Sequence, residues 1–350
     1  MKKPARRKFK PVVRRQSNLR ARAATVVVGL SAVVGAFQFY NPDSALGRVP
    51  FLADAAVHLN IGSASVNAFG RSGEVKLLFS MPGVELEFPL AVGGDPGVLS
   101  YEWTSLRGSE TGFVTQSLAG SGVVSPMLPG FYYLTLVRGE DRQIIREPVV
   151  AVMVPFDRKE GQMLNGYRIG TYLSERLRGG RGNDQHPDGF LEVFPQYLDL
   201  AVSKHLRLRH FVTHDDQAEV WPKYVVLSPR LLDKLELVFA EVERKNEGTA
   251  ALQLELDVHS GFRTPGHNRR ISGAAQDSRH QYGDAADVVV DANRNGRFDQ
   301  NDYRLVVAAV EVVERMYPDL SGGLGIYASR RYSKPYVHID ARGRKSRWRG

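Results

Sequence analysis

The sequence contains no cysteine among its 350 residues. Disulfide bonds and thiolate metal sites are therefore excluded, so a metal centre in this chain must use imidazole and oxygen ligands. The absence of cysteine is compatible with every cellular compartment, and it does not indicate one.

Acidic residues are missing from positions 1–22, which hold ten of the 47 lysines and arginines of the chain. Without this segment the chain has 37 basic and 38 acidic residues, so its basic character belongs largely to a tail. A balanced body argues against nucleic-acid binding. The end of the sequence carries a second basic cluster, which is either solvated or in contact with an anionic polymer or lipid: Arg342, Arg344, Lys345, Arg347 and Arg349.

No charged residue occurs between Arg22 and Asp43. A helix over residues 23–40 would be about 27 Å long, which is close to the thickness of a bilayer core. The basic flank predicts a cytoplasmic N-terminus. We therefore expect a cytoplasmic tail (1–22), a transmembrane anchor (23–40) in the inner membrane, and a body in the periplasm or outside the cell. A cleaved signal peptide is the alternative.

Residues 57–155 show the alternation of apolar and polar residues that is typical of half-buried strands, for example in Val84–Leu90. Glycine and proline turns separate these runs, and the pattern predicts an all-β, sandwich-like domain. No catalytic constellation falls in it, so a spacer or a protein-contact module is its expected role. Residues 156–227 lack a clear pattern and are interpreted as a connecting region.

Two histidines and an aspartate near the end of the chain have the chemistry of a zinc site. They are His280, Asp287 and His338. Catalytic zinc sites take three ligands of this type and leave one position open. Gly283 allows a tight turn between the first two ligands, and the apolar run that follows Asp287 predicts a buried strand.

The order of these motifs resembles the zinc D-Ala-D-Ala carboxypeptidase and murein endopeptidase family, which shares its fold with the hedgehog signalling domain. The similarity rests on Ser260–Arg263, on His280–Asp287 with its internal glycine, on the glycine-rich run Gly322–Tyr327, and on Val337–Asp340. It covers residues 228–350. The resemblance implies an α+β zinc-peptidase domain with a small antiparallel sheet, and an amphipathic helix that begins near Ser228 fits this expectation.

The resemblance also implies an activity, which is zinc-dependent hydrolysis of peptide bonds in peptidoglycan stem peptides, and hence a role in cell-wall remodelling. It assigns to Arg263 the polarisation of the scissile carbonyl or the binding of a substrate carboxylate. The family's usual acidic base before the last ligand is absent here, so Asp340 or Asp284 is the candidate base. The alternative function is a non-catalytic, zinc-containing module that binds peptidoglycan or a protein.

The segment from Asp291 to Asp302 has the spacing of a calcium-binding loop, with a glycine at its sixth position. It predicts a structural Ca²⁺ ion. The alternative is a turn that caps the helix expected from Tyr303 to Met316. The expected calcium ligands are Asp291, Asn293, Asn295, Arg297 (through its carbonyl), Asp299 and Asp302.

Overall fold

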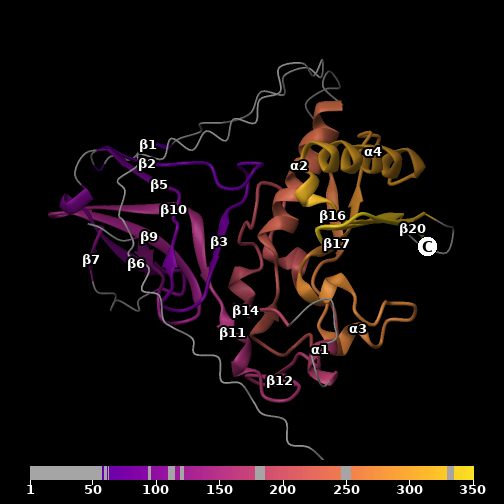
Figure 1. Cartoon of the computed structure of the whole chain (residues 1–350), viewed down its shortest axis with the longest axis horizontal. Helices are drawn as coiled ribbons and strands as arrows, with labels where there is room; N and C mark the ends of the chain where they lie inside the picture. The colour runs from indigo at the N-terminus through magenta and orange to yellow at the C-terminus, as the bar shows by residue number, and fades with distance from the viewer. Residues whose placement is uncertain are drawn as a thin grey trace, which may run out of the picture. The chain divides into compact units, whose positions relative to one another are not determined.

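The computed structural model divides the chain into residues 1–50 and residues 51–350, and only the second unit contains described residues. The described residues are 57–58, 61, 63–93, 96–108, 115–118, 122–177, 186–245, 254–328 and 335–350. Figure 1 shows the strands and helices of this unit.

Residues 57–155 form three separate sheets. The strands are β1 (Val57–His58), β2 (Ser63–Val66), β3 (Leu77–Ser80), β4 (Glu85–Leu86), β5 (Leu90–Gly93), β6 (Ser100–Ser105), β7 (Gln116–Ser117), β8 (Val123–Val124), β9 (Gly130–Arg138), β10 (Asp141–Val152) and β11 (Val154–Pro155). The sheet orders are β1-β2-β5, β3-β10-β9-β6-β7 and β4-β8, while β11 pairs with a later strand. Within the second sheet, β3 runs parallel to β10.

Residues 156–227 are more than a linker in the structure. They contain β12 (Met163–Leu164), β13 (Tyr167–Arg168), α1 (Leu173–Arg176), β14 (Gly189–Val193), β15 (Lys223–Val225) and several short 3₁₀ turns. Strand β14 pairs with both β11 and β15. Their buried side chains share one hydrophobic cluster with residues on both sides in the sequence, from Val75 to Ala341.

The last part of the chain carries a five-stranded sheet in the order β16-β17-β19-β18-β20. Its elements are α2 (Pro229–Lys245), β16 (Leu256–Ser260), α3 (Pro265–Asn268), β17 (Ala285–Val290), α4 (Gln300–Met316), β18 (Gly323–Tyr327), β19 (Tyr336–Asp340) and β20 (Ser346–Arg349). Helices α2 and α4 pack on each other, and α4 contacts β17 and β19 (Figure 1). The helix predicted from Ser228 is confirmed as α2.

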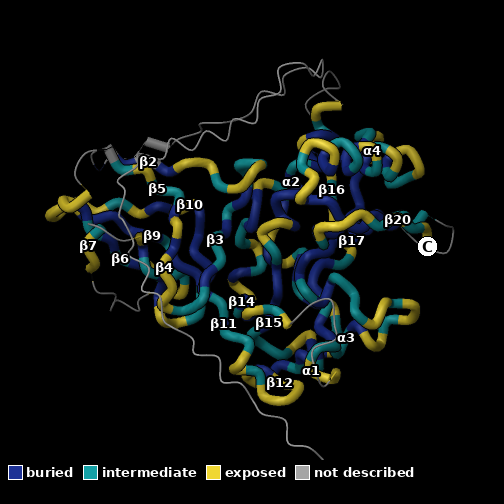
Figure 2. Tube along the Cα trace, viewed as in Figure 1, coloured by how far each residue is buried: buried dark blue, intermediate teal, exposed yellow. Residues whose placement is uncertain are grey.

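Alternation along the central strands gives the sheet two chemically different faces. Val288, Val337 and Ile339 belong to the hydrophobic cluster with the helices. Asp287, His338 and Asp340 alternate with them and therefore point to the opposite face. Strand β17 is buried along its whole length (Figure 2). Polar side chains on a buried strand need partners, so this face is where chemistry is expected.

The predicted fold class requires three corrections. None of the helices in the described part of the chain is long and apolar enough to cross a bilayer, and residues 1–22 and 23–40 lie outside that part. The predicted single-pass anchor, and the inner-membrane location derived from it, are therefore corrected: the structure does not support them. The prediction rested on an apolar run with a basic flank, which does not by itself establish a continuous spanning helix.

The other two corrections concern the sheets. Residues 57–155 form several sheets, one of which mixes parallel and antiparallel strands, in place of a simple all-β sandwich. The sheet of the last part is also mixed, because β20 pairs parallel to β18. Strand β20 was not predicted, because its alternating arginines make the sequence there look like a cluster of charge.

Candidate metal centre

His280, Asp287 and His338 converge on the face of the last sheet opposite to Val288, Val337 and Ile339. Asp287 and His338 are direct partners in the register of β17 and β19. His280 lies in a 3₁₀ turn (Arg279–Tyr282) that precedes β17 and ends at Gly283 in the left-handed conformation, with φ of 66°. A side chain at Gly283 would also collide with the backbone of Val226, at 2.2 Å. Glycine at this position therefore lets the turn approach the preceding segment and place His280 above the strand.

Three potential ligand atoms lie close together in this cluster. Nδ1 of His338 is 2.8 Å from Oδ1 of Asp287, Nε2 of His280 is 3.2 Å from the same oxygen, and the two ring nitrogens are 3.1 Å apart. Tetrahedral zinc with bonds of 2.0–2.1 Å would place its ligand atoms about 3.3 Å apart. The spacing thus fits a zinc ion after a small outward adjustment. Among the described residues, this is the group of His and carboxylate side chains with a spacing that could hold a metal ion.

The remaining ring nitrogen of each histidine has an acceptor. Nδ1–H of His280 donates to the carbonyl oxygen of Gly261 at 2.6 Å, and Nε2–H of His338 donates to Oδ2 of Asp340 at 3.3 Å. A carbonyl and a carboxylate can only accept, so these bonds place the protons on the outer nitrogens. The inner nitrogens, Nε2 of His280 and Nδ1 of His338, both face Oδ1 of Asp287. A proton that His338 holds on Nδ1 toward this carboxylate would leave when a metal binds. Such outer partners are typical of histidine ligands in metal sites.

The pKa values of the two histidines are shifted in opposite directions. Burial lowers the pKa of His280. Burial would also lower the pKa of His338, but hydrogen bonds to Asp287 and Asp340 outweigh it and raise that pKa. Burial would raise the pKa of Asp287, yet the two histidines hold it well below the ordinary value. Asp287 is therefore an anion, as a metal ligand must be.

Arg263 reaches the centre from the turn after β16. It donates to Asp287 through Nη2 and to the hydroxyl of Ser260 through Nε at 2.7 Å. Its side chain is 15 % exposed, and a guanidinium has five N–H donors. Arg263 therefore lies at the rim of the centre and has N–H groups beyond those that hold Asp287 and Ser260.

Asp340 and Asp284, the two candidate bases, are both engaged by arginines. Asp340 is fully buried and accepts from Nε of Arg342 at 2.9 Å and from the amide of Gly323 at 2.7 Å. Burial would raise its pKa, but His338, Arg342 and Gly323 together lower it. Asp284 accepts from Nε of Arg279 through both oxygens at 3.0 Å.

The alternation of β17 separates Asp284 from the metal-ligand face. Asp284 immediately precedes the strand, in phase with Ala286 and Val288 on the helix-packed face. Asp340, in contrast, lies on the same face as His338 but contacts its outer nitrogen. Neither carboxylate is placed among the inner ligand atoms.

Several residues that sequence reasoning did not single out help to build the centre. Gly261 supplies the acceptor for His280, and a side chain there would meet the carbonyl oxygen of His210 at 2.5 Å. Thr213 donates to the carbonyl of Phe262 and accepts from the amide of Thr264. The segment treated as a connecting region therefore supports the loop that carries Arg263. Only long-range contacts reveal this, and a single sequence does not show them.

The carboxylates of the predicted calcium loop are engaged by backbone amides. Oxygens of Asp291 accept from the amides of Asn295 and Gly296 at 3.1 and 2.7 Å, and Asp302 accepts from the amides of Asn293 and Asp299 at 3.1 and 2.6 Å. Asp299 caps α4 through the amide of Asn301. The alternative interpretation, a turn that caps the helix, accounts for these bonds, and calcium has no support.

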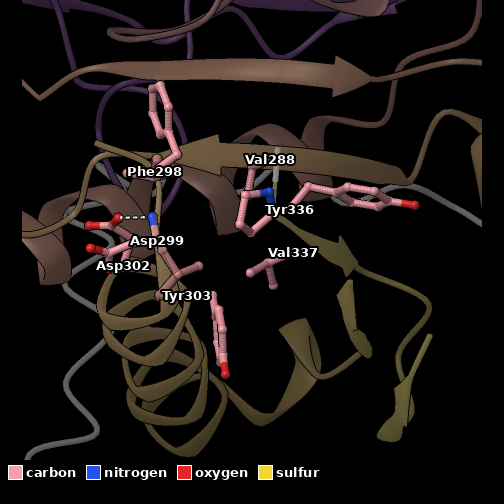
Figure 3. A pocket seen from close by; sticks show the side chains of 10 residues that line it. Val288, Phe298, Asp299, Asp302, Tyr303, Tyr336 and Val337 are labelled. Carbon is pink, nitrogen blue, oxygen red and sulfur yellow. Dashed lines mark hydrogen bonds between the residues drawn. The ribbon is translucent and has the colours of Figure 1, made fainter. Parts of the chain in front are cut away.

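A small cavity lies behind the calcium-like loop, on the helix-packed face of the sheet. Figure 3 shows Val288 and Val337 on one side of it and Asp299, Asp302 and Tyr303 on the other. Its volume is about 10 Å³, which is room for about one water molecule. This cavity is therefore no substrate site, and it lies on the face opposite to His338.

Comparison with known proteins supports the interpretation of the cluster. Residues 239–307 match the family described as Peptidase M15. The matched segment includes His280, Asp287 and Arg263, and it ends before His338. No curated protein and no solved structure matches the chain. The match and the assembled His–Asp–His group together support a peptidase of the zinc-dependent M15 family in the broad sense.

Proposed function

We propose that this protein is a zinc peptidase that hydrolyses peptide bonds in the stem peptides of peptidoglycan. The observation that carries the proposal is the convergence of His280, Asp287 and His338 in a chain that matches the Peptidase M15 family. A zinc ion bound by these three residues would supply Lewis-acid chemistry, polarising a peptide carbonyl and lowering the pKa of water.

The residues around the cluster have separable roles in this proposal. Asp287 and the inner nitrogens of the two histidines hold the metal. Arg263 fixes the free oxygen of Asp287 and directs its other N–H groups to the oxygen of the scissile carbonyl or to a substrate carboxylate. Asp340 acts through His338: it accepts from Nε2–H and thereby orients Nδ1 of that ring toward the metal site.

Hydrolysis also requires a group that accepts a proton from the attacking water. That group must lie within hydrogen-bond reach of the water. Both predicted bases, Asp340 and Asp284, are held by arginines. This observation favours the second candidate function, in which the same zinc-containing fold binds peptidoglycan or a protein partner without cleaving it.

The two functions differ in what happens to purified peptidoglycan. The full chain, loaded with zinc, is incubated with peptidoglycan in water enriched in ¹⁸O, and soluble fragments are analysed by mass spectrometry. A peptidase produces stem-peptide fragments with one ¹⁸O in each new carboxyl group, and the fragment masses identify the bond cleaved. A binding module produces none but sediments with the polymer.

A further inference from the structure

The C-terminal strand β20 places an aromatic side chain next to the metal centre. In the sheet register, Gly325 of β18 is the direct partner of Trp348 on one side and of His338 on the other. The three residues therefore form one row across the sheet, on the face that carries the metal ligands. Asp287 continues the same row on β17.

Because residue 325 is a glycine, the indole of Trp348 can extend over β18 toward His338. A Cβ at Gly325 would lie 2.5 Å from both Cε2 and Nε1 of Trp348, closer than real contacts allow. Without it, the indole lies over β18 and reaches His338, with ring centroids 5.1 Å apart and planes tilted by 48°. Nε1–H of Trp348 donates to the hydroxyl of Tyr327 at 2.9 Å, which fixes the orientation of the ring.

The indole also borders the most accessible part of the centre. His280 and Asp287 are each 2 % exposed, whereas His338 is 6 % exposed. Trp348 itself is half-buried, and its ring lies beside that of His338. The guanidinium of Arg342 lies 5.9 Å from the ring centroid. A molecule that approaches His338 from solvent therefore meets a fixed aromatic surface with a cation near it.

We propose that Trp348 is a substrate-positioning residue, the apolar wall of the subsite beside the metal centre, and that it packs against an aliphatic side chain next to the scissile bond. The proposal rests on the proposed function, because it assumes a peptide substrate. An aromatic ring that is already held in place loses little conformational freedom on binding and offers a large apolar contact.

The test compares Trp348→Ala and Trp348→Phe with the wild-type full chain, using a soluble stem peptide as the probe and zinc-loaded protein. Trp348→Ala is expected to raise KM, and the Kd of the uncleaved peptide at low temperature, by roughly 10- to 30-fold. Trp348→Phe should restore most of the binding. Zinc affinity should change less than threefold in both, since the indole packs beside the ring of His338 but its N–H bonds to Tyr327 and to no ligand.

Two further variants keep the test independent of a folding defect. Gly325→Ala displaces the indole without removing it, so it should weaken peptide binding in the same way as Trp348→Ala. Trp221→Phe removes a tryptophan that lies outside the last sheet, and it should bind peptide as the wild type does. Peptide binding should also change the tryptophan fluorescence of the wild type and of Trp221→Phe, but not that of Trp348→Phe.

Three other results would overturn the proposed role of Trp348. If the wild type cleaves the peptide and Trp348→Ala does so with unchanged KM, Trp348 is no subsite wall. If Trp348→Ala loses zinc in proportion to activity, the ring only supports His338, and the proposal is wrong. If the wild type neither binds nor cleaves stem peptides, the proposed function fails and this proposal fails with it.

Discussion

His338 and Asp340 lie two residues apart on β19, and Nε2–H of the histidine donates to Oδ2 of the aspartate at 3.3 Å. Side chains two apart on a strand share a face, so both point to the metal-ligand side of the sheet. Asp340 lies on the outer nitrogen of the ring, however, and Arg342 and Gly323 occupy its oxygens. This arrangement orients the ligand and leaves the carboxylate poorly placed to accept a proton from water.

The first prediction separates these two roles of Asp340. If it orients His338, Asp340→Asn should weaken zinc binding by roughly 10- to 100-fold, and excess zinc should restore much of the activity. If it is the base, the variant should keep its zinc and lose turnover by roughly 10²- to 10⁴-fold. Zinc affinity from competition with a chelating dye, measured beside turnover, distinguishes the two. Asp284→Asn is the matched control and should keep wild-type zinc affinity.

The second prediction concerns the stoichiometry of the metal. The purified chain should bind about one zinc, because one group of three ligands is assembled in the described residues. His280→Ala and His338→Ala should each bind zinc far more weakly, whereas His267→Ala should not. Elemental analysis after gel filtration gives the zinc content. Full occupancy in the His280→Ala, His338→Ala double variant would show that the metal lies elsewhere.

The third prediction follows from the raised pKa of His338. Zinc needs the unprotonated ring, so zinc affinity should increase as the pH rises through this pKa, above the ordinary value of 6.5. In the metal-free protein the sign is opposite: the proton on His338 stabilises the fold at pH below 6.5, and this contribution is lost as the pH rises through the raised pKa.

Calorimetry of zinc binding in buffers with different ionisation enthalpies measures this proton release. Near neutral pH, the wild type should release a fraction of a proton that falls as the pH increases. The Asp340→Asn variant should release less, because it lacks one of the two carboxylates that hold the proton on His338. Zinc binding without any proton release near neutral pH would contradict the assignment of His338 as a ligand.

The fourth prediction concerns a buried ion pair behind the centre. Nζ of Lys234 on α2 donates to Glu314 of α4 at 2.8 Å and to the carbonyl of Asp340 at 2.6 Å. Both charged side chains are fully buried, so Glu314→Gln should destabilise the protein by about 3–5 kcal/mol. Arg71→Gln breaks an exposed pair with Asp319 and should change stability by less than about 1 kcal/mol.

Denaturant unfolding of the two variants checks this prediction. Equal and small losses would show that the buried pair is not needed. Because Lys234 also anchors the end of β19, Glu314→Gln should in addition weaken zinc binding, while Arg71→Gln should leave it unchanged.

The three side chains that the sequence singled out do lie together in the structure, whereas the architecture around them was predicted less well. His280, Asp287 and His338 were recognisable because each lies in a short motif with a glycine or an apolar strand beside it. Helices α2 and α4 were also predicted, since their apolar residues recur at helical spacing. These are local signals, and a single chain carries them in full.

The failures came from long-range contacts. Strand β20 joins the sheet through its register with β18, and nothing local to Ser346–Arg349 indicates a partner. The contribution of Thr213 and Gly261 to the centre depends on two backbone segments that meet in space. The calcium loop is a different case, because its spacing is that of a metal loop while its carboxylates accept from backbone amides, as Asp and Asn also do in ordinary turns. Calcium there has no support.

Peptide release as a function of zinc per chain tests the central claim most directly. Metal-free full chain is titrated with zinc, and new amino groups released from purified peptidoglycan are counted at each ratio. For a zinc peptidase, release should rise with zinc and saturate at about one equivalent in the wild type, and it should stay at background in His338→Ala. Saturated zinc binding at one equivalent without any release of peptide fragments would contradict the proposed peptidase.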